Sequence, residues 1–227
     1  MRKLAIIAII TLVVAVSTHF GFQLERAGTV SFWVFAVAPT AVLAIVAGAR
    51  AYTDGQLASW MRPVWGDFTR GLVGAALVFG AAYAFARFFQ GTPRESWLAR
   101  LYLQFGDPKL LREHATVFLP AIICAAVAEE LVWRGLVTSL LAETIGSRWA
   151  WAWASAPYAI AHAPTLWALK DPEAGYNPVL PMAALGAGFV WGAMVRRFDG
   201  RLVPAMIAHA MFDWVVVFTF RLWGTSI

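Results

Sequence analysis

The stretch Ala128-Glu129-Glu130-Leu131-Val132-Trp133-Arg134-Gly135 interrupts residues 115–141, a run otherwise apolar enough to cross a membrane. A charged side chain at that depth costs about 2.5–3.5 kcal/mol on insertion scales. Two adjacent carboxylates and an arginine there need partners or a function. We therefore expect a functional site in this segment.

The composition predicts an integral membrane protein. Of 227 residues, 60% are hydrophobic and 14% are charged, against about 25% charged in soluble domains. Basic connections between spans explain the net charge of +5, and no basic cluster interleaved with aromatic residues predicts a nucleic-acid partner. Cys124 is the single cysteine, which excludes an intramolecular disulfide and a multi-cysteine metal site.

Apolar runs predict an all-α fold: one integral membrane domain, residues 1–227, with about seven to eight membrane helices around a polar cavity. The expected spans are residues 4–20, 30–49, 69–89, 115–141, 149–169, 178–195 and a last one from about 202. Pro157 and Pro164 flank His162 and predict a broken backbone there. Residues 91–114 are compatible with a short amphipathic helix on the membrane surface or with a solvated loop.

Basic residues predict a cytoplasmic N-terminus. This orientation places on the cytoplasmic side Arg2, Lys3, Arg50, Arg62, Arg148, Arg196, Arg197 and Arg201. Residues 91–114 are the exception, because their basic side chains would then fall outside.

Six ionisable residues are expected inside the membrane: Glu129, Glu130, Arg134, His162, His209 and Asp213. Four-residue spacing places three pairs on shared helix faces: Glu130 with Arg134, Tyr158 with His162, and His209 with Asp213. At about 100° per residue, Glu129 points to a different side from Glu130. Glu130 is therefore expected to pair with Arg134, which leaves Glu129 free.

These residue types are those of a hydrolytic site: a carboxylate that takes a proton from water, a histidine that orients or shares that proton, and polar groups facing an oxyanion. Each residue alone could instead be a structural contact between helices. The set is harder to explain by packing, because each member costs insertion energy.

Three motifs together resemble a known family. Glu129-Glu130-x-x-x-Arg134, the aromatic-x-x-x-His of Tyr158 to His162, and His209-x-x-x-Asp213 preceded by Leu202-Val203-Pro204-Ala205 resemble the CPBP family of intramembrane proteases. That family includes the type II CAAX prenyl endopeptidases and the Abi proteins. The resemblance covers residues 118–214 and implies a helical bundle with a catalytic core at about 115–214, in a bacterial or archaeal cytoplasmic membrane.

The resemblance also implies a role for each residue. Glu129 would be the general base and His162 would assist it, while His209 and Asp213 would bind the oxyanion. Glu130 and Arg134 would hold the site in shape. It implies glutamate-dependent catalysis without a cofactor; zinc is not favoured, since no His-Glu-x-x-His helix is present, although two histidines and two carboxylates could ligate it.

Two residues depart from the family pattern. Tyr158 replaces a common Phe and adds a hydroxyl to the ring. Asp213 stands where the prenyl proteases carry Asn, and an ionised Asp213 would repel an oxyanion, so it must be protonated or must orient His209. This departure argues against a CAAX substrate more than against proteolysis.

The leading hypothesis is an endopeptidase that cleaves a membrane-associated protein or peptide near its C-terminus or membrane segment. One alternative is a binding or immunity protein that keeps the fold without catalysis. Another is a proton-coupled transporter in which Glu129, His162 and His209 form a relay; the chain lacks the internal repeat that many transporters show.

Overall fold

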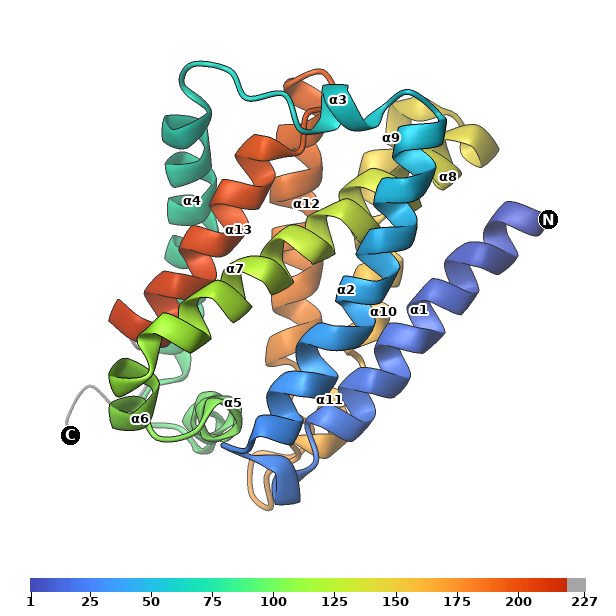
Figure 1. Cartoon of the computed structure of the whole chain (residues 1–227). Coiled ribbons are helices and arrows are strands. Elements are labelled where there is room, and N and C mark those ends of the chain that lie inside the picture. The colour runs from blue at the N-terminus through green and yellow to red at the C-terminus, as the bar shows by residue number, and fades with distance from the viewer. Residues whose placement is uncertain (220–227) are drawn as a thin grey trace.

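A computed structural model describes residues 1–219, and Figure 1 shows their helices packed around one another. Five segments are long and apolar enough to cross a membrane. They are α1 (Arg2–Gly21), α2 (Val30–Thr53), α4 (Asp67–Phe89), α12 (Val179–Arg197) and the continuous segment Ala115–Ile145. Within the described range there is no β-strand, only a bridge between Asp171 and Gly175. The predicted multi-pass helical bundle is confirmed.

The segment Ala115–Ile145 carries the opening motif and changes its winding at that motif. It consists of α7 (Ala115–Glu130), the π-helical η3 (Leu131–Val137) and α8 (Thr138–Ile145). The apolar pattern predicts the helix but not the π-helical part. π-Helical turns are rare and often lie at functional sites.

One expected span is divided into short helices in the structure. Residues 149–169 form α9 (Ser147–Trp153), α10 (Ser155–His162) and α11 (Thr165–Ala168), so the break predicted near His162 is confirmed. The last span is α13 (Val203–Trp214), which continues as the π-helical η4 (Val215–Thr219). Within residues 1–219, five segments meet the length and apolarity expected of a complete crossing.

Residues 91–114 are helical, as one of the two interpretations expected. After η2 (Pro93–Glu95), α5 (Ser96–Phe105) buries Trp97, Leu98 and Tyr102, and α6 (Pro108–Glu113) leads into α7. Asn177 donates from Nδ2 to the Trp97 carbonyl at 2.8 Å, which ties α5 to the connection after α11. The remaining short elements are η1 (Leu24–Arg26) and α3 (Leu57–Trp60).

Small residues let α12 approach α9 and α10 closely. A Cβ added at Gly192 would lie 2.8 Å from the Trp151 carbonyl oxygen, and one added at Gly188 would lie 2.9 Å from the Ser155 side chain. This contact fixes α12 against the broken helix that carries His162.

Several ion pairs between helices lie at one end of the bundle. Glu143 lies 2.6 Å from Lys3 and 2.9 Å from Arg50, which joins α8 to α1 and α2. Arg201 pairs with Asp67 at 2.6 Å and joins the start of α13 to α4. In Figure 1 the N-terminus, α3 and the α12–α13 connection lie at the upper end, and α5, α6 and α11 at the lower end. The basic residues expected on one side of the membrane thus share one end, and which side that end faces stays a prediction.

Candidate active site

A cavity of about 600 Å³ lies inside the bundle. Its wall is mostly apolar. The residues that form it come from many elements along the chain, from α1 to η4. The polar side chains that line it include Ser17, Thr18, Thr40, Tyr102, Glu129, Tyr158, His162, His209 and Asp213. Glu130 and Arg134 do not line it, so the two adjacent glutamates face different surroundings, as the helical spacing predicts.

The carboxylate of Glu129 is held by Tyr158. The Tyr158 hydroxyl donates to Glu129 Oε2 at 2.7 Å, and the tyrosine side chain is buried. This bond joins the end of α7 to α10, and it fixes the orientation of a carboxylate that faces the cavity.

His162 is oriented by the backbone of its own helix. Its Nδ1 lies 2.9 Å from the Tyr158 carbonyl oxygen, and its ring meets the Tyr158 ring edge to face at 4.9 Å. Because a carbonyl oxygen only accepts, Nδ1 must carry the proton. In the neutral imidazole, Nε2 is then an acceptor that can bind a water molecule.

Glu130 joins Arg134 and His209 in a second group. Oε1 of Glu130 lies 2.9 Å from Nδ1 of His209 and 3.2 Å from a guanidinium nitrogen of Arg134. All three residues are buried, with Glu130 at 0% exposure. The predicted pair of Glu130 with Arg134 is present, and the contact with His209 was not predicted.

Asp213 approaches the other nitrogen of the same histidine. Its Oδ2 lies 3.5 Å from His209 Nε2. With Nδ1 donating to Glu130, Nε2 can accept from a protonated Asp213, or an imidazolium can donate to an ionised one. Both interpretations of Asp213 made from the sequence are therefore compatible with this geometry.

Aromatic rings enclose Arg134 and His209. Trp191 of α12 stacks on the His209 ring at 4.0 Å and 20°, and the Arg134 guanidinium lies 5.0 Å from its ring centroid. The same guanidinium lies 4.4 Å from the Tyr158 ring. Sequence reasoning missed Trp191. The sequence signal that could have found it is its position next to Gly192 and three residues after Gly188, on a helix expected to pack closely against its neighbours.

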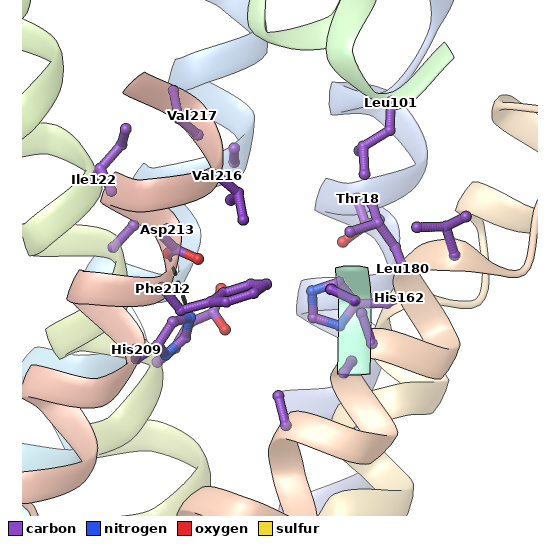
Figure 2. A pocket seen from close by; sticks show the side chains of 18 of the residues that line it. Thr18, Leu101, Ile122, His162, Leu180, His209, Phe212, Asp213, Val216 and Val217 are labelled. Carbon is purple, nitrogen blue, oxygen red and sulfur yellow. Dashed lines mark ion pairs between the residues drawn. The ribbon is translucent and has the colours of Figure 1, made fainter. Parts of the chain in front are cut away.

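His162 lies across the cavity from His209 and Asp213. Figure 2 shows His162 on one side and His209 with Asp213 on the other, with the Phe212 ring projecting between them. Within residues 1–219, no hydrogen bond joins His162 directly to Glu129; Tyr158 contacts both. The seven predicted site residues thus lie in one region of the bundle. Five of them line the cavity, and Glu130 and Arg134 lie behind its wall.

Over the same described range, no three His, Cys, Asp or Glu side chains are grouped so as to hold a metal ion.

Part of the chain is similar to one known family. Residues 112–215 match the family model described as type II CAAX prenyl endopeptidase Rce1-like. The comparisons found no matching curated protein and no matching solved structure. The match confirms the resemblance to the CAAX protease family and supports an endopeptidase in general terms. It includes every residue of the two groups described above.

Proposed function

We propose that this multi-pass membrane protein, with its similarity to type II CAAX prenyl endopeptidases, hydrolyses a peptide bond by means of a water molecule activated by Glu129 and His162. The observation that carries the proposal is the position of Tyr158. Its hydroxyl holds Glu129 and its carbonyl sets the tautomer of His162. Two groups that can accept from one water molecule therefore face one cavity.

In the proposed step, water bound at His162 Nε2 loses a proton to the Glu129 carboxylate. The resulting hydroxide forms a bond to the carbonyl carbon of the scissile peptide, and the carbonyl oxygen becomes an oxyanion. When the tetrahedral intermediate collapses, the C–N bond breaks and Glu129 returns the proton to the leaving nitrogen. The products are a carboxylic acid and an amine, and proton transfer between them gives a carboxylate and an ammonium ion.

The oxyanion would face His209. Nε2 of His209 can donate to it only if the ring carries a second proton, which Glu130 and Asp213 on its two sides would stabilise. Stacking of Trp191 on the His209 ring fixes the orientation of that ring. Glu130 and Arg134 do not line the cavity and would position His209 without touching the substrate.

The cavity wall supports a proposal for the substrate class. Most of its surface is apolar, and the helices around it are candidate membrane spans. The proposed substrate is therefore a membrane-associated protein or peptide cleaved near its C-terminus or membrane segment. No prenyl group is assumed, since Asp213 departs from the residue of the prenyl proteases.

The test is cleavage of a membrane-tethered reporter peptide by the purified protein in liposomes. Glu129→Gln and His162→Ala should each abolish cleavage. Glu113→Gln on α6, whose side chain is 52% exposed, is the matched carboxylate control and should cleave normally. Unimpaired cleavage by both site variants would refute the assignment, and uptake of a proton-coupled solute without cleavage would favour a transporter.

A second experiment addresses the substrate. Protein termini are compared between membranes that contain the active protein and membranes that contain Glu129→Gln. Termini present only with the active protein identify its substrates. A cellular phenotype that survives Glu129→Gln would instead favour the binding or immunity hypothesis.

A further inference from the structure

A second hollow lies at the basic end of the bundle, apart from the catalytic cavity. It is lined by Ser59, Arg62, Val64, Arg70, Arg197, Phe198, Asp199 and Arg201. These residues come from α3, the connection before α4, the start of α4, the end of α12 and the turn between α12 and α13. Its volume of about 640 Å³ is large enough for a small ligand.

Two of the arginines are fixed before any ligand binds. Buried Asp67 accepts from Arg70 at 2.8 Å and from Arg201 at 2.6 Å, and it also accepts from the backbone of Val64 at 2.7 Å. The Arg70 guanidinium further lies 4.8 Å over the Phe198 ring. Holding these side chains in place reduces the entropy cost of binding a ligand.

The charges of the other two arginines are not neutralised by an ion pair in the part of the chain that the structure describes. Arg62 and Arg197 are exposed, and within the described part of the chain neither forms an ion pair. Four guanidinium groups surround the hollow, against the carboxylates of Asp67 and Asp199. The excess of positive charge suits an anion, and the planar donors of arginine suit phosphate oxygens in particular.

The place of the hollow favours a phosphate at the membrane surface. Trp65, three residues from Arg62, is 97% exposed. Tryptophan is enriched where membrane helices meet the headgroups. The α4 span begins at Asp67, two residues after this tryptophan in the sequence. A lipid headgroup at that level would place its phosphate beside Arg62 and Arg197.

We propose that this hollow binds a phosphate group, supplied by an anionic phospholipid or by a free phosphate. Arg62 and Arg197 contact the phosphate oxygens, while Arg70 and Arg201 add donors in orientations set by Asp67. The site is separate from the proposed proteolysis, and it does not depend on Glu129 or His162.

The experiment measures retained phosphatidylglycerol by native mass spectrometry after delipidation of the purified protein and reconstitution with that lipid. Arg62→Gln and Arg197→Gln should each weaken retention roughly tenfold, as expected for one lost charge-assisted contact. Arg196→Gln is the matched control, because Arg196 is an exposed neighbour that does not line the hollow. Unchanged thermal unfolding of the three variants would show that they remain folded.

A second arm distinguishes the sources of the phosphate. Inorganic phosphate is titrated against the delipidated protein, and binding lost only in Arg62→Gln and Arg197→Gln supports a free phosphate as ligand. Lipid retention with no binding of inorganic phosphate supports a headgroup. Equal effects of Arg196→Gln and Arg197→Gln in both arms, or no effect of either, would overturn the proposal.

Discussion

His209 donates from Nδ1 to Oε1 of Glu130 across 2.9 Å, and both side chains are buried. This bond joins α13 to the end of α7, so the second glutamate of the motif is a structural partner of a histidine that lines the cavity. The adjacent Glu129 has a separate partner in Tyr158. The two glutamates should therefore respond differently to the same substitution.

Glu130→Gln should destabilise the protein far more than Glu129→Gln. The first change leaves buried Arg134 without its carboxylate, and breaking such a buried pair costs about 3–5 kcal/mol. The second change keeps an oxygen that can accept from Tyr158 and should alter the free energy of unfolding by about 1 kcal/mol or less. Chemical unfolding in detergent compares the two variants, and equal stabilities would contradict the division between them.

Tyr158→Phe should lower kcat roughly tenfold and leave KM nearly unchanged. The change removes the hydroxyl that orients Glu129 but keeps the ring that contacts Arg134 and His162, and one hydrogen bond of about 1.4 kcal/mol corresponds to that factor. The family pattern has Phe here, so activity should fall without disappearing. Steady-state kinetics on the reporter peptide give both constants. Tyr176→Phe, at a tyrosine that is 55% exposed, is the control, and a loss confined to KM would contradict a positioning role.

Gly192→Ala should destabilise the bundle by about 1–3 kcal/mol, the usual cost of overpacking. The new methyl group would lie 2.8 Å from the Trp151 backbone oxygen, which has no side-chain rotamer to escape by. Gly186→Ala is the control on the same helix, since a Cβ there meets nothing within 4 Å. Thermal unfolding of the two variants side by side is the measurement, and a similar shift in both would show that helix propensity rather than contact dominates.

The connection between α11 and α12 should lose a stabilising contact in acid. Backbone donation from Ala174 and the guanidinium of Arg100 hold the pKa of the Asp171 carboxyl well below its ordinary value. A lowered pKa in the folded state adds stability that is complete above the unfolded value of about 3.9 and disappears as the pH falls through the lowered folded pKa. Asp171→Asn should therefore cost roughly 1 kcal/mol at pH 7, allowing for partial exposure.

The difference between the wild type and Asp171→Asn should shrink as the pH falls below about 4. The unfolding free energies of both proteins are measured in detergent from pH 7 to pH 3. Glu173→Gln, an exposed carboxylate in the same connection, should show no such trend. A difference that stays constant to pH 3 would mean that the ionised Asp171 does not stabilise the connection.

Local patterns in the sequence predict the helices and the pairs within each helix. The pair of Glu130 with Arg134 and the shared face of His209 with Asp213 follow from four-residue spacing alone. The contacts of Glu130 with His209 and of Trp191 with His209 do not, because they depend on how α7, α12 and α13 rotate against one another. Length alone also predicts one continuous span at residues 149–169, which the structure divides into α9, α10 and α11.

The π-helical η3 sets the rotational phase of α8 relative to α7. A π-helix spends more than four residues on each turn, so the polypeptide there is longer than an α-helix with the same direction at both ends. If the same seven residues of Leu131–Val137 wound as an α-helix, α8 would turn by about 100° about its axis. Glu143 would then face away from Lys3 and Arg50, although every chemical group of the catalytic cavity would still be encoded. The winding of this segment, and not only its residues, therefore keeps α8 in register with α1 and α2.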